Sequence, residues 1–137
     1  MLSVTPDTNT LVSATISEGN EYLLLKNGKI GKIKIVTSPA ILLEFKEVIS
    51  RKKFGFSRPQ IDAVIGHILS IAEIVMPTIQ LQAIKEDPPD NKVLECAVSA
   101  NSDYIVSGDA HLLSLKEFKG IKIVKTTDIL DKLNEKG

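Results

Sequence analysis

The chain has 137 residues, of which 43% are hydrophobic and 25% are charged, and its 17 basic residues balance 17 acidic ones. These values are typical of one globular domain, and we expect residues 1–137 to form it. The formal net charge of zero excludes a globally basic surface, so a nucleic-acid partner would have to be contacted by a local patch.

Cysteine usage and the apolar segments indicate the compartment. The single cysteine, Cys96, excludes a disulfide within the chain and is typical of a reducing environment. The apolar stretches are far shorter than the ~20 residues that cross a membrane. The chain also reaches Asp7 before any long apolar region, unlike a signal peptide. We therefore expect a cytoplasmic protein without a membrane partner.

Strand-like and helical segments alternate along the chain. In order, the patterns predict a strand at 2–5, helices at 10–16 and 21–26, a turn at 27–29, a strand at 32–37, helices at 39–49 and 59–72, a strand at 74–76, a helix at 91–100 that follows a rigid non-helical start at 87–90, a strand at 104–107, a short helix at 111–115, a strand at 120–124 and a helix ending near 134. Such alternation indicates βαβ units. We predict a three-layer α/β/α, Rossmann-like domain with a mainly parallel sheet of four or five strands and the first strand central.

Two acids follow predicted strands that lie far apart in the sequence. Asp7 comes directly after the first strand, and Asp109 ends the run 104–109. Ligands of parallel sheets bind beyond the carboxyl ends of the strands, so these two side chains can meet in one crevice. Crowded carboxylates repel each other unless a cation lies between them. The pattern predicts a hard divalent metal with oxygen ligands.

Two further acids extend this hypothesis. Glu44 has Ile41 and Val48 as its helical neighbours, which puts it at the margin of the buried face. Asp90 precedes the helix at 91–100. Each acid alone also has an ordinary interpretation, as a helix cap, a turn residue or a solvated helix residue. Their order on this alternation of elements favours a shared site.

Four motifs occur in a fixed order. They are Asp7-Thr8-Asn9; Leu43-Glu44 with Glu47-Val48-Ile49-Ser50-Arg51; Asp87-Pro88-Pro89-Asp90-Asn91-Lys92-Val93-Leu94-Glu95-Cys96-Ala97; and Asp103-Tyr104-Ile105-Val106-Ser107-Gly108-Asp109 with His111-Leu112-Leu113. This series resembles the PIN-domain family, in the branch described as toxin components of toxin–antitoxin (VapBC-like) pairs. The resemblance covers nearly the whole chain, and the stretch 87–113 is its most specific part.

The resemblance implies a PIN-like fold and a metal-dependent endoribonuclease that hydrolyses RNA phosphodiester bonds. It implies Mg²⁺ or Mn²⁺ as cofactor, a cognate antitoxin as partner, and a homodimer. The implied catalytic and metal-binding residues are Asp7, Glu44, Asp90 and Asp109, and the implied supporting residues are Asn9, Asn91 and Ser107. Pro89 departs from the family pattern, where a third acid is common, so the choice of Asp90 over its neighbour Asn91 rests on spacing.

Metal-dependent hydrolysis is also chemically consistent with these residues. Metals held by carboxylates supply a water of lowered pKa, neutralise charge on the phosphate and align the attack. No histidine, cysteine or serine nucleophile is needed. We expect His67, His111 and Cys96 to have ordinary structural or surface roles.

Basic residues gather in one local patch, which consists of Arg51, Lys52, Lys53 and Arg58. Cations contact phosphates, and the aromatic residues Phe54 and Phe56 beside them can stack on unpaired bases. The alternative is a solvated loop between helices whose phenylalanines pack into the core.

Three other classes of protein remain as alternatives. A haloacid-dehalogenase-type phosphatase has a nucleophilic Asp after the first strand, but it needs a general acid two residues later, where this chain has Asn9. A response-regulator receiver needs paired acids there, whereas residues 5–10 contain one. A catalytically silent PIN-like scaffold that binds RNA or a partner is disfavoured by the four acids.

Overall fold

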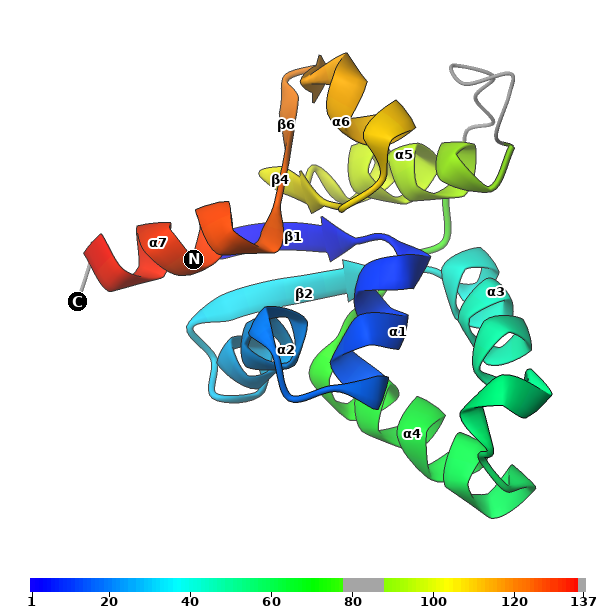
Figure 1. Ribbon diagram of the computed structural model, residues 1–137. Coiled ribbons are helices and arrows are strands. Elements are labelled where there is room, and N and C mark those ends of the chain that lie inside the picture. The colour runs from blue at the N-terminus through cyan, green and yellow to red at the C-terminus, as the bar shows by residue number, and fades with distance from the viewer. Residues whose placement is uncertain (78–87, 136–137) are drawn as a thin grey trace.

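A computed structural model describes residues 1–77 and 88–135 (Figure 1). The strands are β1 (Leu2–Pro6), β2 (Ile33–Thr37), β3 (Glu73–Ile74), β4 (Tyr104–Val106), β5 (Glu117–Phe118) and β6 (Ile121–Val124). They form one sheet in the order β3-β2-β1-β4-β6-β5, in which only the β5–β6 pair is antiparallel. The predicted mainly parallel sheet is confirmed, and β1 lies inside it as expected.

Helices cover both faces of the sheet. They are α1 (Thr8–Ile16), α2 (Asn20–Lys29), α3 (Pro39–Ile49), α4 (Arg58–Ile71), α5 (Pro88–Ala100), α6 (Ala110–Leu115) and α7 (Thr126–Glu135), with a 3₁₀ turn η1 at Lys52–Phe54. In Figure 1, α5 and α6 lie near β4 and β6 in the upper part of the view, and α1, α2 and α4 lie below β1 and β2. The architecture is therefore the predicted α/β/α arrangement. No helix in the described ranges is long and apolar enough to span a membrane.

The sheet has one strand more than the four or five predicted. The additional strand is β5, a two-residue segment that forms a hairpin with β6 through Lys119 and Gly120. Gly120 has a φ of +82°, a left-handed conformation that glycine adopts without steric cost. Two residues are too few to show the alternating pattern that identifies a strand.

The predicted turn at residues 27–29 is wrong, because α2 continues to Lys29. Gly28 lies against the side chain of Ile35 on β2, and a Cβ atom there would be 2.5 Å from the Cγ1 atom of Ile35. This glycine therefore permits close approach of a helix to the sheet. The chain turns later, at Gly31, whose φ is +83°.

The predicted non-helical start before α5 is also wrong for the residues that the structure describes. The helix begins at Pro88, so Asp90 lies in its first turn rather than before it. Proline is tolerated in a first helical turn because its missing N–H has no partner there in any case. The remaining residue of that prediction, Asp87, lies outside the described residues.

Three of the helices that follow parallel strands begin with a polar cap. Asp7 caps α1, Ser38 caps α3 and Asp109 caps α6, each with a side-chain oxygen that accepts a backbone N–H of the first turn. The strands before them contribute fully buried core residues, such as Val4 and Ile105. The buried sheet thus fixes where these polar side chains emerge.

Candidate active site at the carboxyl ends of β1 and β4

Asp7 is the most buried acid at this edge of the sheet, with 4% of its surface exposed. Its backbone N–H donates to the carbonyl of Val106 on β4, at 3.0 Å. Its Oδ1 atom accepts from the Thr10 backbone N–H at 2.8 Å and from the Thr10 hydroxyl at 2.6 Å. Its Oδ2 atom accepts from the Ser107 hydroxyl at 2.5 Å. The carboxylate is therefore held in one orientation by groups from α1 and from the end of β4.

A single hydroxyl connects Asp7 with Asp109. The Ser107 oxygen that donates to Asp7 also accepts the backbone N–H of Asp109, at 2.9 Å. The side chain of Asp109 caps α6 through its Oδ2 atom, which accepts from Leu112 N at 3.1 Å. The expected meeting of Asp7 and Asp109 at one edge of the sheet is thus observed. We call Asp7, Thr10, Ser107 and Asp109 the carboxylate cluster.

Among the residues that the structure describes, the carboxylate cluster carries negative charge without a cationic partner. Burial raises the pKa of Asp7 above its ordinary value of 3.8, against hydrogen bonds from Ser107 and Thr10 that lower it, and the charge of Asp109 raises it further. No lysine, arginine or histidine pairs with either acid within the described part of the chain. A buried carboxylate beside a second acid is stabilised by protonation or by a bound cation.

The donor atoms that remain in the cluster suit a hard metal ion. A carboxylate oxygen has two lone pairs, so Oδ2 of Asp7 retains one, and Oδ1 of Asp109 has no hydrogen bond within the described structure. Oxygen donors of this kind are the usual ligands of Mg²⁺, which is often held by one or two carboxylates, waters and substrate phosphate. The two acids of the cluster can therefore act as metal ligands, although they do not provide a complete coordination shell.

The structure describes the side chains of three of the four predicted acids, Asp7, Glu44 and Asp109. Glu44 is half-buried on α3, and no group of three metal-ligating side chains forms among the residues described, which include Asp7, Glu44 and Asp109. Asp90 lies in the first turn of α5, and its side chain is outside the described structure. The site as described consists of Asp7 and Asp109, with Glu44 on a neighbouring helix.

The predicted supporting residues differ in their surroundings. Ser107 is part of the carboxylate cluster, and Asn91 is buried in α5. Asn9 is exposed and lines a small cleft of about 230 Å³, together with Thr10, Ser107 and Lys125. Because Thr10 and Ser107 belong to both, this cleft adjoins the carboxylate cluster.

The basic patch is exposed, but its aromatic residues are not free. All four cations, Arg51, Lys52, Lys53 and Arg58, are exposed. Phe54 and Phe56 are partly buried and pack against the core, while the Lys53 ammonium lies 5.1 Å from the centroid of the Phe54 ring. The geometry favours the interpretation in which the phenylalanines anchor the loop rather than stack on bases.

Thr10 is the member of the cluster that the sequence did not identify. Its position three residues after the capping acid predicts that its backbone N–H contacts Asp7, as in any capped helix. The second contact, from its hydroxyl, depends on a side-chain rotamer that no sequence pattern specifies.

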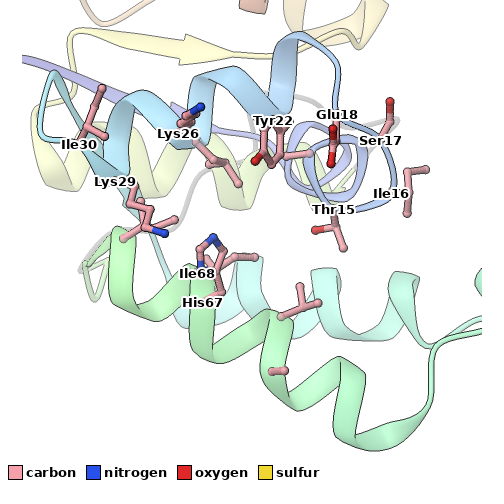
Figure 2. A pocket seen from close by; sticks show the side chains of 15 residues that line it. Thr15, Ile16, Ser17, Glu18, Tyr22, Lys26, Lys29, Ile30, His67 and Ile68 are labelled. Atoms are coloured by element: carbon pink, nitrogen blue, oxygen red, sulfur yellow. The ribbon is translucent and has the colours of Figure 1, made fainter.

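A second concavity lies on the helical layer, between α1, α2 and α4. It has a volume of about 760 Å³ and an apolar floor that includes Leu25, Ile68 and Ile71. Figure 2 shows Lys26, Lys29 and His67 at this groove. None of the predicted acids lines it, so we call it the helical groove and treat it as separate from the carboxylate cluster.

Comparison with known proteins identifies the class. The family model for the PIN domain matches residues 4–111, a range that contains Asp7, Glu44, Asp90 and Asp109. The chain belongs to the PIN domain family, whose members are generally nucleases.

Solved structures share the fold at low sequence identity. A crystal structure of VapBC2 from Rickettsia felis bound to a DNA fragment from their promoter gives a TM-score of 0.65 and is 17% identical, covering 89% of this chain and 97% of that chain. A structure of PAE2754 from Pyrobaculum aerophilum gives a TM-score of 0.66 and is 15% identical, covering 98% and 90% respectively. A search of curated protein sequences gave no match.

Proposed function

We propose that this protein is a cytoplasmic, metal-dependent endoribonuclease that hydrolyses phosphodiester bonds of RNA. The observation that carries the proposal is the carboxylate cluster, in which buried Asp7 is connected to Asp109 through one hydroxyl and has no cationic partner in the described structure. Membership of a family of nucleases supports the reaction class.

In this proposal Asp7, Glu44, Asp90 and Asp109 hold Mg²⁺ or Mn²⁺. When bound, the metal lowers the pKa of a water and neutralises charge on the phosphate. Asp7 would offer the acceptor site of Oδ2 that Ser107 does not occupy, and Asp109 would offer Oδ1, which accepts no hydrogen bond in the described structure. Glu44 and Asp90 belong to α3 and α5, two helices that pack against each other.

The chain's other polar groups position the acids and the substrate. Ser107 holds Asp7 and Asp109 in register, while Asn9 and Asn91 support the site from α1 and α5. The exposed basic patch of Arg51, Lys52, Lys53 and Arg58 binds the phosphates of the RNA backbone in this proposal. Cations that contact phosphates supply affinity that does not depend on the base sequence.

Cleavage of a labelled pool of RNA by the purified chain tests the proposal. We expect cleavage with Mg²⁺ or Mn²⁺, none after chelation, and recovery when metal is restored. A labelled pool of single-stranded DNA with the same sequences as the RNA pool serves as the control for substrate class. Cleavage that persists in excess chelator would reject the metal-dependent mechanism, and metal-dependent cleavage of DNA alone would reject the assignment to RNA.

We further propose that the protein is the toxin of a toxin–antitoxin pair and that its antitoxin binds in the helical groove. The similar Rickettsia felis structure is described as VapBC2, which supports a paired protein. Beside the groove, Ile16, Tyr22 and Ile30 expose 49%, 40% and 59% of their surfaces, an apolar area that a partner can cover. Lys26 and Lys29 at its edge favour an amphipathic segment with acidic residues.

Co-purification with the product of the neighbouring reading frame tests this interaction. Ile30→Asp should weaken the complex, whereas Leu43→Asp, at a leucine on α3 that is 71% exposed against 59% for Ile30, should not. An unchanged complex with Ile30→Asp would place the partner elsewhere.

We also propose a homodimer, since two-fold dimers are the commonest homo-oligomers. Light scattering over a wide concentration range should give twice the chain mass, and a monomer throughout would contradict it.

A further inference from the structure

Thr10 makes one contact that helix capping does not require. An Asp at the cap position needs only a backbone N–H from the third residue of the helix, and Thr10 supplies that bond at 2.8 Å. Any residue except proline would supply it equally. The hydroxyl of Thr10 adds a second, shorter bond to the same Oδ1 atom, at 2.6 Å.

The hydroxyl is directed to Asp7 in preference to its alternative acceptor. The carbonyl of Val106 lies 3.4 Å from the Thr10 oxygen, which is long for an O–H donor. Thr10 and Asp7 are 5% and 4% exposed, so water competes little for either group. A buried hydroxyl that donates to an ionised oxygen makes one of the stronger hydrogen bonds in proteins.

These bonds divide the lone pairs of Asp7 unevenly. Each carboxylate oxygen has two acceptor sites. Thr10 occupies both sites on Oδ1, through its N–H and its hydroxyl, whereas the Ser107 hydroxyl occupies one site on Oδ2. The carboxylate therefore has one acceptor site left, and it is on Oδ2.

We infer that Thr10 is a positioning residue that restricts Asp7 to a single-oxygen contact with the metal. This inference rests on the proposed metal-dependent nuclease. Ca²⁺ accepts carboxylates through one or two oxygens in a flexible shell, whereas Mg²⁺ requires near-octahedral geometry and usually retains several waters. Closing Oδ1 should therefore favour Mg²⁺ or Mn²⁺ over Ca²⁺ at this site.

Thr10→Val tests the inference, because valine keeps a similar shape and the backbone N–H and replaces the hydroxyl with a methyl group that cannot donate. Mn²⁺ binding is measured from the electron paramagnetic resonance signal of the free ion, with Ca²⁺ as competitor and no RNA present. We expect Mn²⁺ affinity to fall by ~10-fold or more, the usual loss when a group that orients a metal ligand is removed. The ratio of Mn²⁺ to Ca²⁺ affinity should fall as well, and Thr10→Ser should restore both.

Thr15→Val is the matched control, since Thr15 lies in the same helix and its hydroxyl donates to the Leu11 carbonyl instead. It should bind Mn²⁺ as the wild type does. Wild-type Mn²⁺ affinity and selectivity in Thr10→Val would overturn the inference while the nuclease assignment stands. Absence of both Mn²⁺ binding and metal-dependent cleavage in the wild type would overturn the two together.

Discussion

Two buried polar clusters lie beside β1, and they differ in whether a hydrogen-bond acceptor site remains unoccupied. The carboxylate cluster lies at the end of the strand, where one oxygen of Asp7 retains an acceptor site. The other cluster lies on the face that α5 covers. There the hydroxyls of Thr5 and Ser102 lie 2.6 Å apart, and the Cys96 thiol is hydrogen-bonded with Ser38 and Thr5. We call this second group the thiol cluster.

Both clusters contain a group whose pKa is raised, and the cause is the same. Burial disfavours the charged form of Asp7 and also raises the pKa of the Cys96 thiol to about 11. A raised pKa therefore does not distinguish a site from the core. What distinguishes the carboxylate cluster is a second acid beside the first and bonding capacity that the fold does not use.

The largest expected effect is a loss of RNA cleavage when the carboxylate cluster is changed, but not when the thiol cluster is changed. Asp7→Asn keeps an oxygen to accept from Thr10 but loses the charge that holds metal, so RNA cleavage should fall by at least about 10²–10³-fold. Cys96→Ala should retain cleavage at temperatures where it is folded. Cleavage assays with both variants, normalised to folded protein by circular dichroism, measure this contrast.

The stability of metal-free Asp7→Asn completes that test. Because the substitution removes a buried charge that has no cationic partner among the described residues, the free energy of unfolding should be unchanged or slightly raised. A variant that unfolds, or one that cleaves RNA like the wild type, would contradict the role assigned to Asp7.

The next effect is a loss of stability at alkaline pH that belongs to the thiol cluster. The pKa of Cys96 rises from 9.0 when exposed to about 11 when folded. The folded state therefore binds the proton more tightly, and this contribution is complete below pH 9 and is lost as the pH rises to 11. It corresponds to about 3 kcal/mol at most.

Urea unfolding between pH 8 and 11 measures this contribution, with Cys96→Ala as the control. The variant should lose less stability than the wild type over that range. Equal pH profiles for the two proteins would show that the thiol does not titrate across folding.

These contrasts also show what the sequence could predict. The strand-end positions of Asp7 and Asp109 follow from apolar runs that each stop at an acid, and parallel strands bring such ends together. The role of Gly28 could not be predicted, because it depends on Ile35, which approaches only in the folded sheet. The relation of Glu44 to the other acids was equally inaccessible, since the rotation and tilt of α3 are set by packing rather than by local pattern.

Metal binding should raise the melting temperature of the protein only if the carboxylate cluster is intact, and a change in the thiol cluster should not alter this increase. Ligand that binds only the folded state adds about 2.7 kcal/mol at 100 times its Kd. Saturating Mn²⁺ should therefore raise the melting temperature of the wild type and of Cys96→Ala by several degrees, and much less that of Asp7→Asn. Differential scanning fluorimetry with and without Mn²⁺ measures the shift, and equal shifts in all three proteins would place the metal elsewhere.

The smallest expected effect tests whether a residue of α3 belongs to the same metal site as the carboxylate cluster. Glu44 is half-buried and Glu47, one turn along, is exposed, so Gln at either position changes the charge equally in different surroundings. If Glu44 completes the metal site, Glu44→Gln should lower cleavage by ~10-fold, as for a residue that supports a metal, and raise the metal concentration needed for half-maximal rate. Glu47→Gln should change neither quantity.

Both variants should keep the free energy of unfolding within about 0.5 kcal/mol of the wild type, as is usual for surface substitutions. Titrating Mg²⁺ in the cleavage assay separates the two positions. If both variants behave like the wild type, the site is confined to the ends of β1 and β4 with α5, because α3 would then contribute packing but no ligand.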